Sequence, residues 1–171
     1  MSNKIIILTG DIQTGKTTLL QQFCLQQNNI AGILTPVVNG KRMFYDISGK
    51  EFFEMEAQGD EEQLTIGKYL FSTAAFTKAN HILLATGKGV EYLIIDEIGP
   101  LELRKQQGLY QSFKEILSAA FNYALIVVVR QSLVDEVIAV FDLGTPVVFN
   151  CNTEMHKGNH RDALSILRET L

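Results

Sequence analysis

The sequence predicts an α/β fold in which helices cover both faces of a mostly parallel β-sheet. Short runs of valine, isoleucine and leucine alternate along the 171 residues with segments of helical periodicity. A loop with two glycines, residues 10–17, separates the first apolar run from the first helical segment. Asn39-Gly40, a strong hairpin signal, indicates that an antiparallel β-meander is inserted into this sheet.

The chain begins with a strand, a glycine loop and a helix. Lys4–Leu8 is a short apolar run of the kind that forms buried parallel strands. Thr17–Cys24 predicts a helix, because its leucines, phenylalanine and cysteine share one face. A strand, a glycine loop and a helix in this order form the context of a phosphate-binding loop.

The antiparallel meander follows. Ile30–Val38 predicts a β-branched strand that turns at Asn39-Gly40 into a return strand at Arg42–Ile47. A second tight turn then leads into a strand at Glu51–Met55. We expect the insertion to span about residues 32–55.

The remaining segments alternate between helices and strands. A polar stretch, Gln58–Gln63, predicts a loop, and Ser72 is expected to cap a helix that runs to Ala85 and ends at Gly87. The later elements are expected at Tyr92–Ile95 (strand), Leu109–Phe121 (helix), Leu125–Val129 (strand), Leu133–Phe141 (helix), Val147–Phe149 (strand) and Ala163–Leu171 (helix).

Composition limits the classes of protein to which the chain can belong. Lys plus Arg total 15 against 19 for Asp plus Glu, and no basic cluster occurs, so we expect no dedicated nucleic-acid binding. No apolar stretch approaches the ~20 residues of a membrane span, and no signal-peptide pattern precedes the first strand. Two cysteines are too few for a disulfide framework. We therefore expect a cytoplasmic protein without membrane association, with residues 1–171 forming one domain.

Residues 10–17 form a complete G-x-x-x-x-G-K-[ST] phosphate-binding loop, or P-loop. Gly10 and Gly15 permit close backbone approaches that a side chain blocks, so successive N–H groups can surround an anion. In such loops the lysine binds the β- and γ-phosphates and the last hydroxyl ligates Mg²⁺. The residues expected to contact the nucleotide are Gly10, Asp11, Ile12, Gln13, Thr14, Gly15, Lys16, Thr17 and Thr18.

A second chemical signal is the acidic pair Asp96-Glu97, which follows the apolar strand Tyr92–Ile95. In P-loop enzymes an acid at the end of such a strand holds Mg²⁺ beside the loop threonine, so Asp96 and Thr17 are the expected metal ligands. Glu97 is expected to face the γ-phosphate and to polarise the attacking water, as a catalytic residue together with Lys16. The alternative is an acidic pair that merely opens a loop.

Five further polar residues are candidates for the site. Arg130 ends a strand and is interpreted as a catalytic cation that stabilises charge on the γ-phosphate, the alternative being a solvated strand end. Arg42 can reach over the site from the meander. Glu102 is interpreted either as a carboxylate that orients a lysine or arginine or as a plain surface acid. Asn150 and Asn152 leave the last strand where a nucleotide base can lie.

A zinc site is a competing interpretation of the region after that strand. Cys151, His156 and His160 are three ligands close together in sequence. A fourth ligand is missing, however, and Gly158 interrupts the helix that would align the two histidines. These two features disfavour zinc.

Over most of its length the chain resembles the small THEP-type nucleoside-triphosphatases. The resemblance rests on the P-loop, Gly32–Val38, Gly40–Ile47, Ile66–Tyr69, Val148–Asn150 and above all Ile94–Leu103. It implies a RecA-like P-loop NTPase sheet and Mg²⁺-dependent hydrolysis of nucleoside triphosphates with loose base preference. Asp11 departs from the family pattern and brings a negative charge close to the phosphates.

Three functions remain open on the sequence. The leading hypothesis is a Mg²⁺-dependent nucleoside-triphosphatase acting on ATP, GTP and other triphosphates. A small nucleotide or metabolite kinase would need an acceptor pocket and an arginine-rich lid, and no arginines cluster in a loop. A nucleotide-gated module that switches a protein partner is the third.

Overall fold

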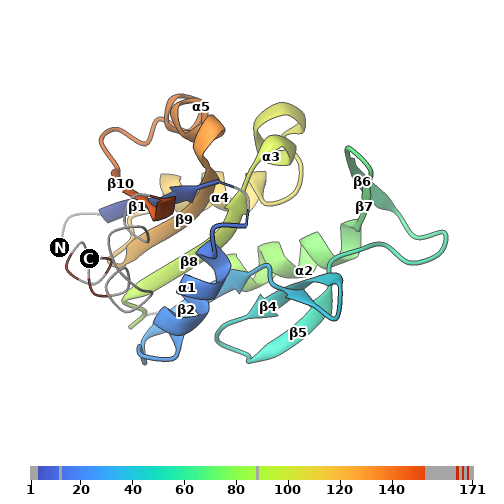
Figure 1. Ribbon diagram of the computed structural model, residues 1–171, viewed down its shortest axis with the longest axis horizontal. Coiled ribbons are helices and arrows are strands. Elements are labelled where there is room, and N and C mark those ends of the chain that lie inside the picture. The colour runs from blue at the N-terminus through green and yellow to red at the C-terminus, as the bar shows by residue number, and fades with distance from the viewer. Residues whose placement is uncertain are drawn as a thin grey trace.

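The computed structural model describes residues 4–11, 13–87 and 89–152, together with Ser165, Leu167 and Glu169. Its main sheet has eight strands in the order β10-β1-β9-β8-β2-β4-β3, with β5 paired to β4 (Figure 1). The five strands from β10 to β2 run parallel. They are β10 (Val147–Asn150), β1 (Lys4–Gly10), β9 (Ala124–Arg130), β8 (Tyr92–Ile98) and β2 (Ile30–Leu34). The predicted α/β class with a mostly parallel sheet is therefore confirmed.

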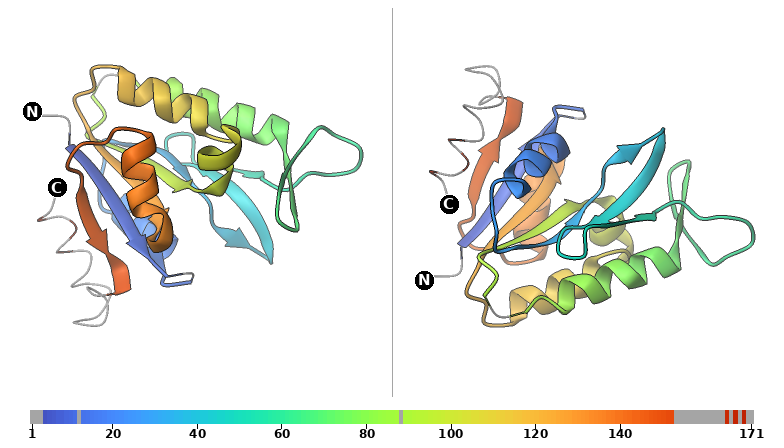
Figure 2. Two further views of the ribbon diagram at one scale, coloured as in Figure 1. Left: turned by 90° about the horizontal axis from the view of Figure 1, so that it is seen from above. Right: turned by 90° about the horizontal axis from the view of Figure 1, so that it is seen from below.

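Helices cover both faces of this sheet, as Figure 2 shows. Helix α1 (Lys16–Cys24) packs on one face. The other face carries α2 (Thr73–Leu84), α3 (Pro100–Lys105), α4 (Tyr110–Ser118) and, after the 3₁₀ turn η1 (Gln131–Leu133), α5 (Val134–Val140). Among the described residues, no helix has both the length and the apolar character needed to cross a lipid bilayer.

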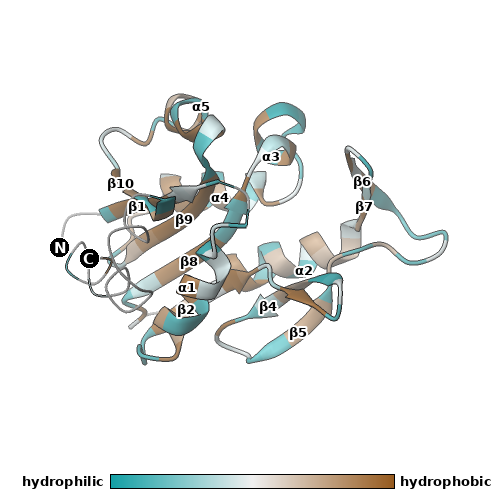
Figure 3. Ribbon diagram, viewed as in Figure 1, coloured by the Kyte–Doolittle hydropathy of each residue, from teal (hydrophilic) through white to brown (hydrophobic). Residues whose placement is uncertain are grey.

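The side chains of the central strands alternate between the two faces of the sheet, and this creates a hydrophobic core on each face. In β1, Ile6 and Leu8 pack towards α1, whereas Ile7 belongs to the core on the opposite face, which carries α2, α3, α4 and α5. Successive side chains of a strand point to opposite faces, so a strand covered on both sides must be apolar throughout. Strand β9, with five consecutive buried aliphatic residues from Leu125 to Val129, is the clearest case (Figure 3).

The antiparallel meander is present, but its first strand is interrupted. The predicted hairpin joins β3 (Val37–Val38) to β4 (Lys41–Asp46), and β5 (Glu51–Glu54) pairs with β4. The prediction of one continuous strand over Ile30–Val38 is wrong. Pro36 has no N–H to contribute to a ladder, so the strand stops at Leu34 and resumes as β3.

A β-hairpin, a short α-helix and the 3₁₀ turn η1 were not predicted. A second hairpin, β6 (Gln63–Ile66) with β7 (Tyr69–Ser72), directly precedes the N-terminus of α2 (Figure 1). The short helix α3 follows β8. The predicted cap of α2 is confirmed, because the Ser72 hydroxyl accepts the Ala75 N–H at 3.2 Å. The predicted helix Ala163–Leu171 falls almost entirely outside the described residues.

Candidate functional site: the P-loop cavity

The P-loop connects the carboxyl end of β1 to the first turn of α1. Gly10 has a φ of 153°, and a Cβ atom there would lie 2.9 Å from both Asn152 Oδ1 and Thr14 Oγ1, so only glycine fits. The Lys16 ammonium donates to the carbonyl oxygens of Gly10 (3.0 Å) and Asp11 (2.6 Å). It also lies 3.3 Å from Thr14 Oγ1. These contacts hold the cation across the mouth of the loop.

Asn152 ties the loop to the segment after β10. Its side-chain Oδ1 accepts the Asp11 N–H at 3.0 Å, and its Nδ2 donates to the Asp11 carboxylate at 2.7 Å. The Asp11 charge is therefore engaged by a side-chain amide, which accounts for an acid at this position of a phosphate-binding loop. Ile12, which was predicted to contact the nucleotide, lies outside the described residues.

Asp96 lies at the floor of the site, 2% exposed. Its Oδ2 accepts two hydrogen bonds, from the Thr17 hydroxyl at 2.9 Å and from the Thr35 N–H at 3.1 Å. Burial raises the pKa of Asp96 to about 6, although these hydrogen bonds oppose the shift, and the neighbouring charge of Glu97 adds to it. The break in the meander strand is what frees the Thr35 amide for this contact.

The pairing of Thr17 with Asp96 fits a magnesium ion. Hydroxyl and carboxylate oxygens are hard donors, and Mg²⁺ is bound in such sites through one or two protein ligands, waters and substrate phosphates. A bound cation also favours the charged form of a buried carboxylate whose pKa is raised. Among the described residues, His, Cys, Asp and Glu side chains nowhere form a group of three suited to a metal, so the ligands here would be one carboxylate and one hydroxyl.

Glu97 and Arg130 form an ion pair beside Asp96. Arg130 Nε lies 2.7 Å from Glu97 Oε1, and both side chains are partly exposed. The acidic pair was predicted to follow its strand, but β8 continues to Ile98, which lies opposite Val129. The β8–β9 register shifts between Ile95 and Ile98, and the two acids lie at this irregularity. Both side chains line the same cavity.

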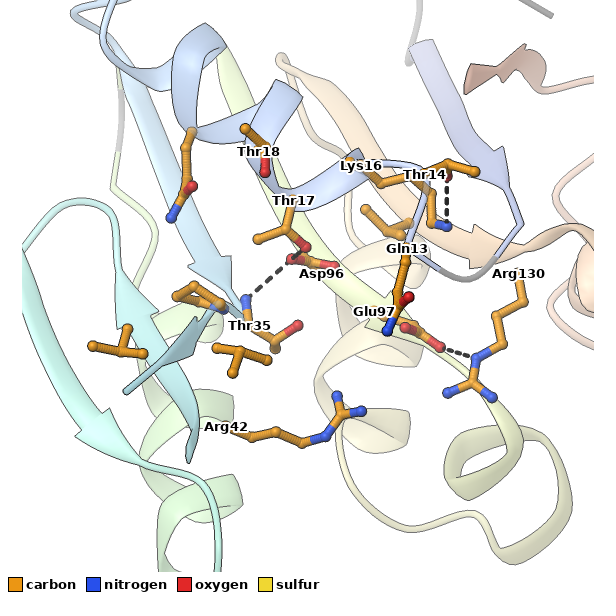
Figure 4. A pocket seen from close by; sticks show the side chains of 16 residues that line it. Gln13, Thr14, Lys16, Thr17, Thr18, Thr35, Arg42, Asp96, Glu97 and Arg130 are labelled. Atoms are coloured by element: carbon orange, nitrogen blue, oxygen red, sulfur yellow. Dashed lines mark hydrogen bonds and ion pairs between the residues drawn. The ribbon is translucent and has the colours of Figure 1, made fainter. Parts of the chain in front are cut away.

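These groups surround one cavity of about 510 Å³ at the carboxyl ends of the parallel strands (Figure 4). In Figure 4, Lys16 and Thr17 lie above Asp96, Gln13 reaches down beside Glu97, Arg130 approaches Glu97 from β9, and Arg42 enters from the meander. The predicted residues that line the cavity are Gln13, Thr14, Gly15, Lys16, Thr17, Thr18, Arg42, Asp96, Glu97 and Arg130. The sequence analysis missed the apolar wall Pro36–Val38, and also Gln21, Thr35 and Val128.

Four candidate residues have other surroundings. Glu102 is 3% exposed, so it is not a surface acid, and its contacts are to backbone amides instead of a lysine or arginine. Asn150 Oδ1 accepts the Asn152 N–H at 2.9 Å, and neither asparagine lines the cavity. Cys151 is buried in the core beside α1, where burial raises the pKa of its thiol to about 11. His156 and His160 lie outside the described residues.

Known proteins share this fold and part of the sequence. A family model described as NTPase matches residues 5–157. The nucleoside-triphosphatase THEP1 of Saccharolobus solfataricus is 32% identical over 108 residues, which are 58% of this chain and only 62% of that protein. The crystal structure of THEP1 from Aquifex aeolicus has a TM-score of 0.72 at 22% identity, with 95% of this chain and 98% of that chain covered. The solution structure of a human cancer-related nucleoside triphosphatase has a TM-score of 0.68 at 21% identity, with 98% and 99% covered.

Proposed function

The chain belongs to the NTPase family, and on that premise we propose that it is a Mg²⁺-dependent nucleoside-triphosphatase. Its substrates would be ATP, GTP and other nucleoside triphosphates, with loose base selectivity, and its products a diphosphate and phosphate. The observation that carries this proposal is a single cavity with the lysine of a P-loop on one side and the acidic pair Asp96-Glu97 on the other.

The P-loop supplies the binding of the triphosphate. Its backbone N–H groups and the positive end of α1 attract the phosphates, and Lys16 exchanges its contacts with loop carbonyls for phosphate oxygens. Thr17 and Asp96 would hold the Mg²⁺, with the Thr35 amide fixing the carboxylate. When bound, the metal would neutralise charge on the phosphates. The apolar wall Pro36–Val38 offers no base-specific hydrogen bond from its side chains, which accords with loose base selectivity.

Glu97 and Arg130 supply the chemistry. Glu97 would accept the proton of the attacking water as that water displaces the diphosphate from the γ-phosphorus. Arg130 Nε holds Glu97 Oε1 in place, while the terminal guanidinium nitrogens of Arg130 remain available to the γ-phosphate oxygens. Catalysis of this kind is mostly positioning and charge stabilisation, so few side chains suffice.

The test is release of phosphate from ATP and GTP with no acceptor present, with Mg²⁺ and with EDTA. We expect turnover that requires Mg²⁺, and in Glu97→Gln we expect kcat to fall roughly 10²–10⁴-fold while nucleotide affinity stays within a few-fold. The matched control is Glu136→Gln, which removes an exposed acid from α5 and should retain full activity. Undiminished turnover in Glu97→Gln would show that another group activates the water. Transfer of phosphate only to an added acceptor would favour a kinase.

A further inference from the structure

Among the described residues, three cationic side chains line the cavity: Lys16, Arg42 and Arg130. Each is held by a different kind of contact. Lys16 contacts carbonyl oxygens of its own loop, and Arg130 is paired with Glu97. Arg42 forms no ion pair with any residue that the structure describes. Its guanidinium Cζ lies 4.9 Å from the centre of the Tyr69 ring. An arginine held by an aromatic face keeps its N–H edges available for a ligand, because the contact uses the plane of the guanidinium.

Arg42 is placed on the side of the cavity where the terminal phosphate would lie. It also lines a neighbouring cavity of about 90 Å³, which shares Asp96, Glu97 and Arg130 with the larger one. In Figure 4 its guanidinium lies below Glu97, across the site from Lys16 and Thr17. A cation here faces the same phosphate as Glu97, the group proposed to activate the attacking water.

Tyr69 is not a loose surface ring, although it is 38% exposed. It stacks on Phe71 with ring centres 5.9 Å apart and planes inclined by 12°. Phe71 contacts Phe76 of α2, and Phe76 contacts Phe44 of β4 edge-on at 5.0 Å. This aromatic row, Tyr69–Phe71–Phe76–Phe44, links the β6–β7 hairpin to the strand that carries Arg42. The ring and the arginine are therefore held in one packed unit.

We propose that Arg42 contacts the terminal phosphate of a bound nucleoside triphosphate, and that Tyr69 is the positioning residue that holds Arg42 for this contact. The proposal rests on the proposed function, whose site it extends by one cation. A guanidinium binds a phosphate through parallel N–H···O bonds, and the contact with the Tyr69 ring restrains the guanidinium before the nucleotide arrives. The β6–β7 hairpin thus acquires a role in discriminating triphosphates from diphosphates.

The experiment measures dissociation constants for ADP and for a non-hydrolysable ATP analogue, with Mg²⁺, alongside kcat/KM for ATP. We expect Arg42→Gln to weaken binding of the analogue at least about 10-fold and binding of ADP less than about 2-fold, because a charge-assisted contact to one phosphate is lost. Tyr69→Leu should lower kcat/KM about 3- to 10-fold, whereas Tyr69→Phe, which keeps the ring, should stay within about 2-fold of the parent. Lys68→Gln is the matched control, because the Lys68 ammonium lies over the same ring at 5.5 Å and does not line the cavity.

A double-mutant cycle separates positioning from a general effect on the fold. Tyr69→Leu should have no further effect in an Arg42→Gln background, since both changes remove the same contact. If the two substitutions lower kcat/KM independently, so that their effects multiply, Tyr69 does not act through Arg42. If Arg42→Gln weakens the binding of ADP as much as the binding of the analogue, Arg42 does not contact the terminal phosphate. Arg42→Lys, which keeps the charge without the planar fork, should fall between the parent and Arg42→Gln. If the parent binds the analogue but releases no phosphate from ATP, the proposed function fails, while these binding measurements still decide the role of Arg42.

Discussion

Glu102 shows how far burial changes the behaviour of one acidic residue. Its Oε2 accepts the Gly99 N–H at the start of α3, and its Oε1 accepts the Leu109 N–H just before α4, each at 2.9 Å. Burial raises the pKa of Glu102 to about 7, against the opposing effect of these hydrogen bonds. One carboxyl group therefore fixes the starts of two helices directly after the strand that carries the acidic pair.

The first prediction concerns this group. A pKa of about 7 in the folded chain against 4.5 as the ordinary value means that the folded state binds the Glu102 proton more tightly. Its stabilising contribution is complete below pH 4.5 and is lost as the pH rises through 7. The glutamine of Glu102→Gln does not titrate. Between pH 5 and pH 8 the free energy of unfolding of this variant should therefore fall less than that of the parent, by on the order of 2–3 kcal/mol. Urea unfolding at pH 5 and pH 8 measures the difference.

The quantity to compare is the slope of the free energy of unfolding against pH. Asp96, whose pKa is also raised, contributes a change of the same sign to the parent and to Glu102→Gln. Glu62→Gln, an exposed acid, serves as the control and should keep the parent slope. Equal pH dependence in the parent and in Glu102→Gln would contradict the assignment.

At the same scale, the sequence predicted the side chains of the site better than its backbone contacts. The P-loop and the acidic pair carry their chemistry in residue types at fixed spacing, and the fold brings Lys16, Thr17, Asp96 and Glu97 to one cavity. Thr35 donates its main-chain N–H to Asp96, and because every residue but proline has this group, residue type gives no signal for that contact. Pro36, which ends the strand beside it, was the one available indication.

Among the elements, apolar strands and helices with a clear apolar face were predictable, whereas the β6–β7 hairpin and helix α3 were not. The β6–β7 hairpin is short, with Gly67 at a φ of 58° in its turn. A glycine between two alternating segments could have indicated it. Helix α3 has only six residues, so its apolar periodicity is weak. Its detectable signal was Pro100 at the first helical position followed by Glu102, the spacing of a capping box.

The close approach of β2 and β8 gives a prediction for an element. A Cβ atom at Gly32 would lie 2.0 Å from the Ile94 carbonyl oxygen, and Gly32 has a φ of 118°. Gly40, in the β3–β4 turn, has a φ of 79° but nothing within 4 Å of its Cβ position. Gly40→Ala should therefore cost only the ~1–2 kcal/mol of an unfavourable backbone angle. Gly32→Ala should cost several kcal/mol more, and thermal unfolding of the two variants measures the difference. Similar melting temperatures would show that β2 can move away from β8 without loss.

The whole molecule places its chemistry at one edge, where the parallel strands end. Five segments far apart in the chain meet there: the P-loop, the end of β2, β4, β8 and β9. Open α/β sheets bind ligands at this edge, because loops and helix N-termini converge on it. A nucleotide bound in this cavity would contact several of these segments together, so its binding energy would add to the stability of the folded chain as a whole.

A prediction for the whole molecule follows from this linkage. Mg²⁺-ATP at a hundred times its Kd should stabilise the parent by about 2.7 kcal/mol and raise its melting temperature. Lys16→Ala should fold but lose this response, because the ammonium proposed to bind the phosphates is gone. Lys114→Ala removes a lysine of α4 that does not line the cavity, and it should respond like the parent. An equal response in Lys16→Ala would contradict the assignment of the phosphate site.

The position of β1 in the sheet has a consequence for synthesis of the protein. Strand β1 is built first, yet its partners come last: Lys4 lies opposite Ala124 in β9, and Ile6 lies opposite Val147 in β10. Asn152, which holds the P-loop through Asp11, comes later still. During synthesis on the ribosome, the apolar strand β1 therefore stays unpaired until most of the chain has emerged. Pairings between segments so distant in sequence also form slowly. Nascent chains that stop before β10 are accordingly expected to carry the complete phosphate-binding motif and still fail to capture nucleotide.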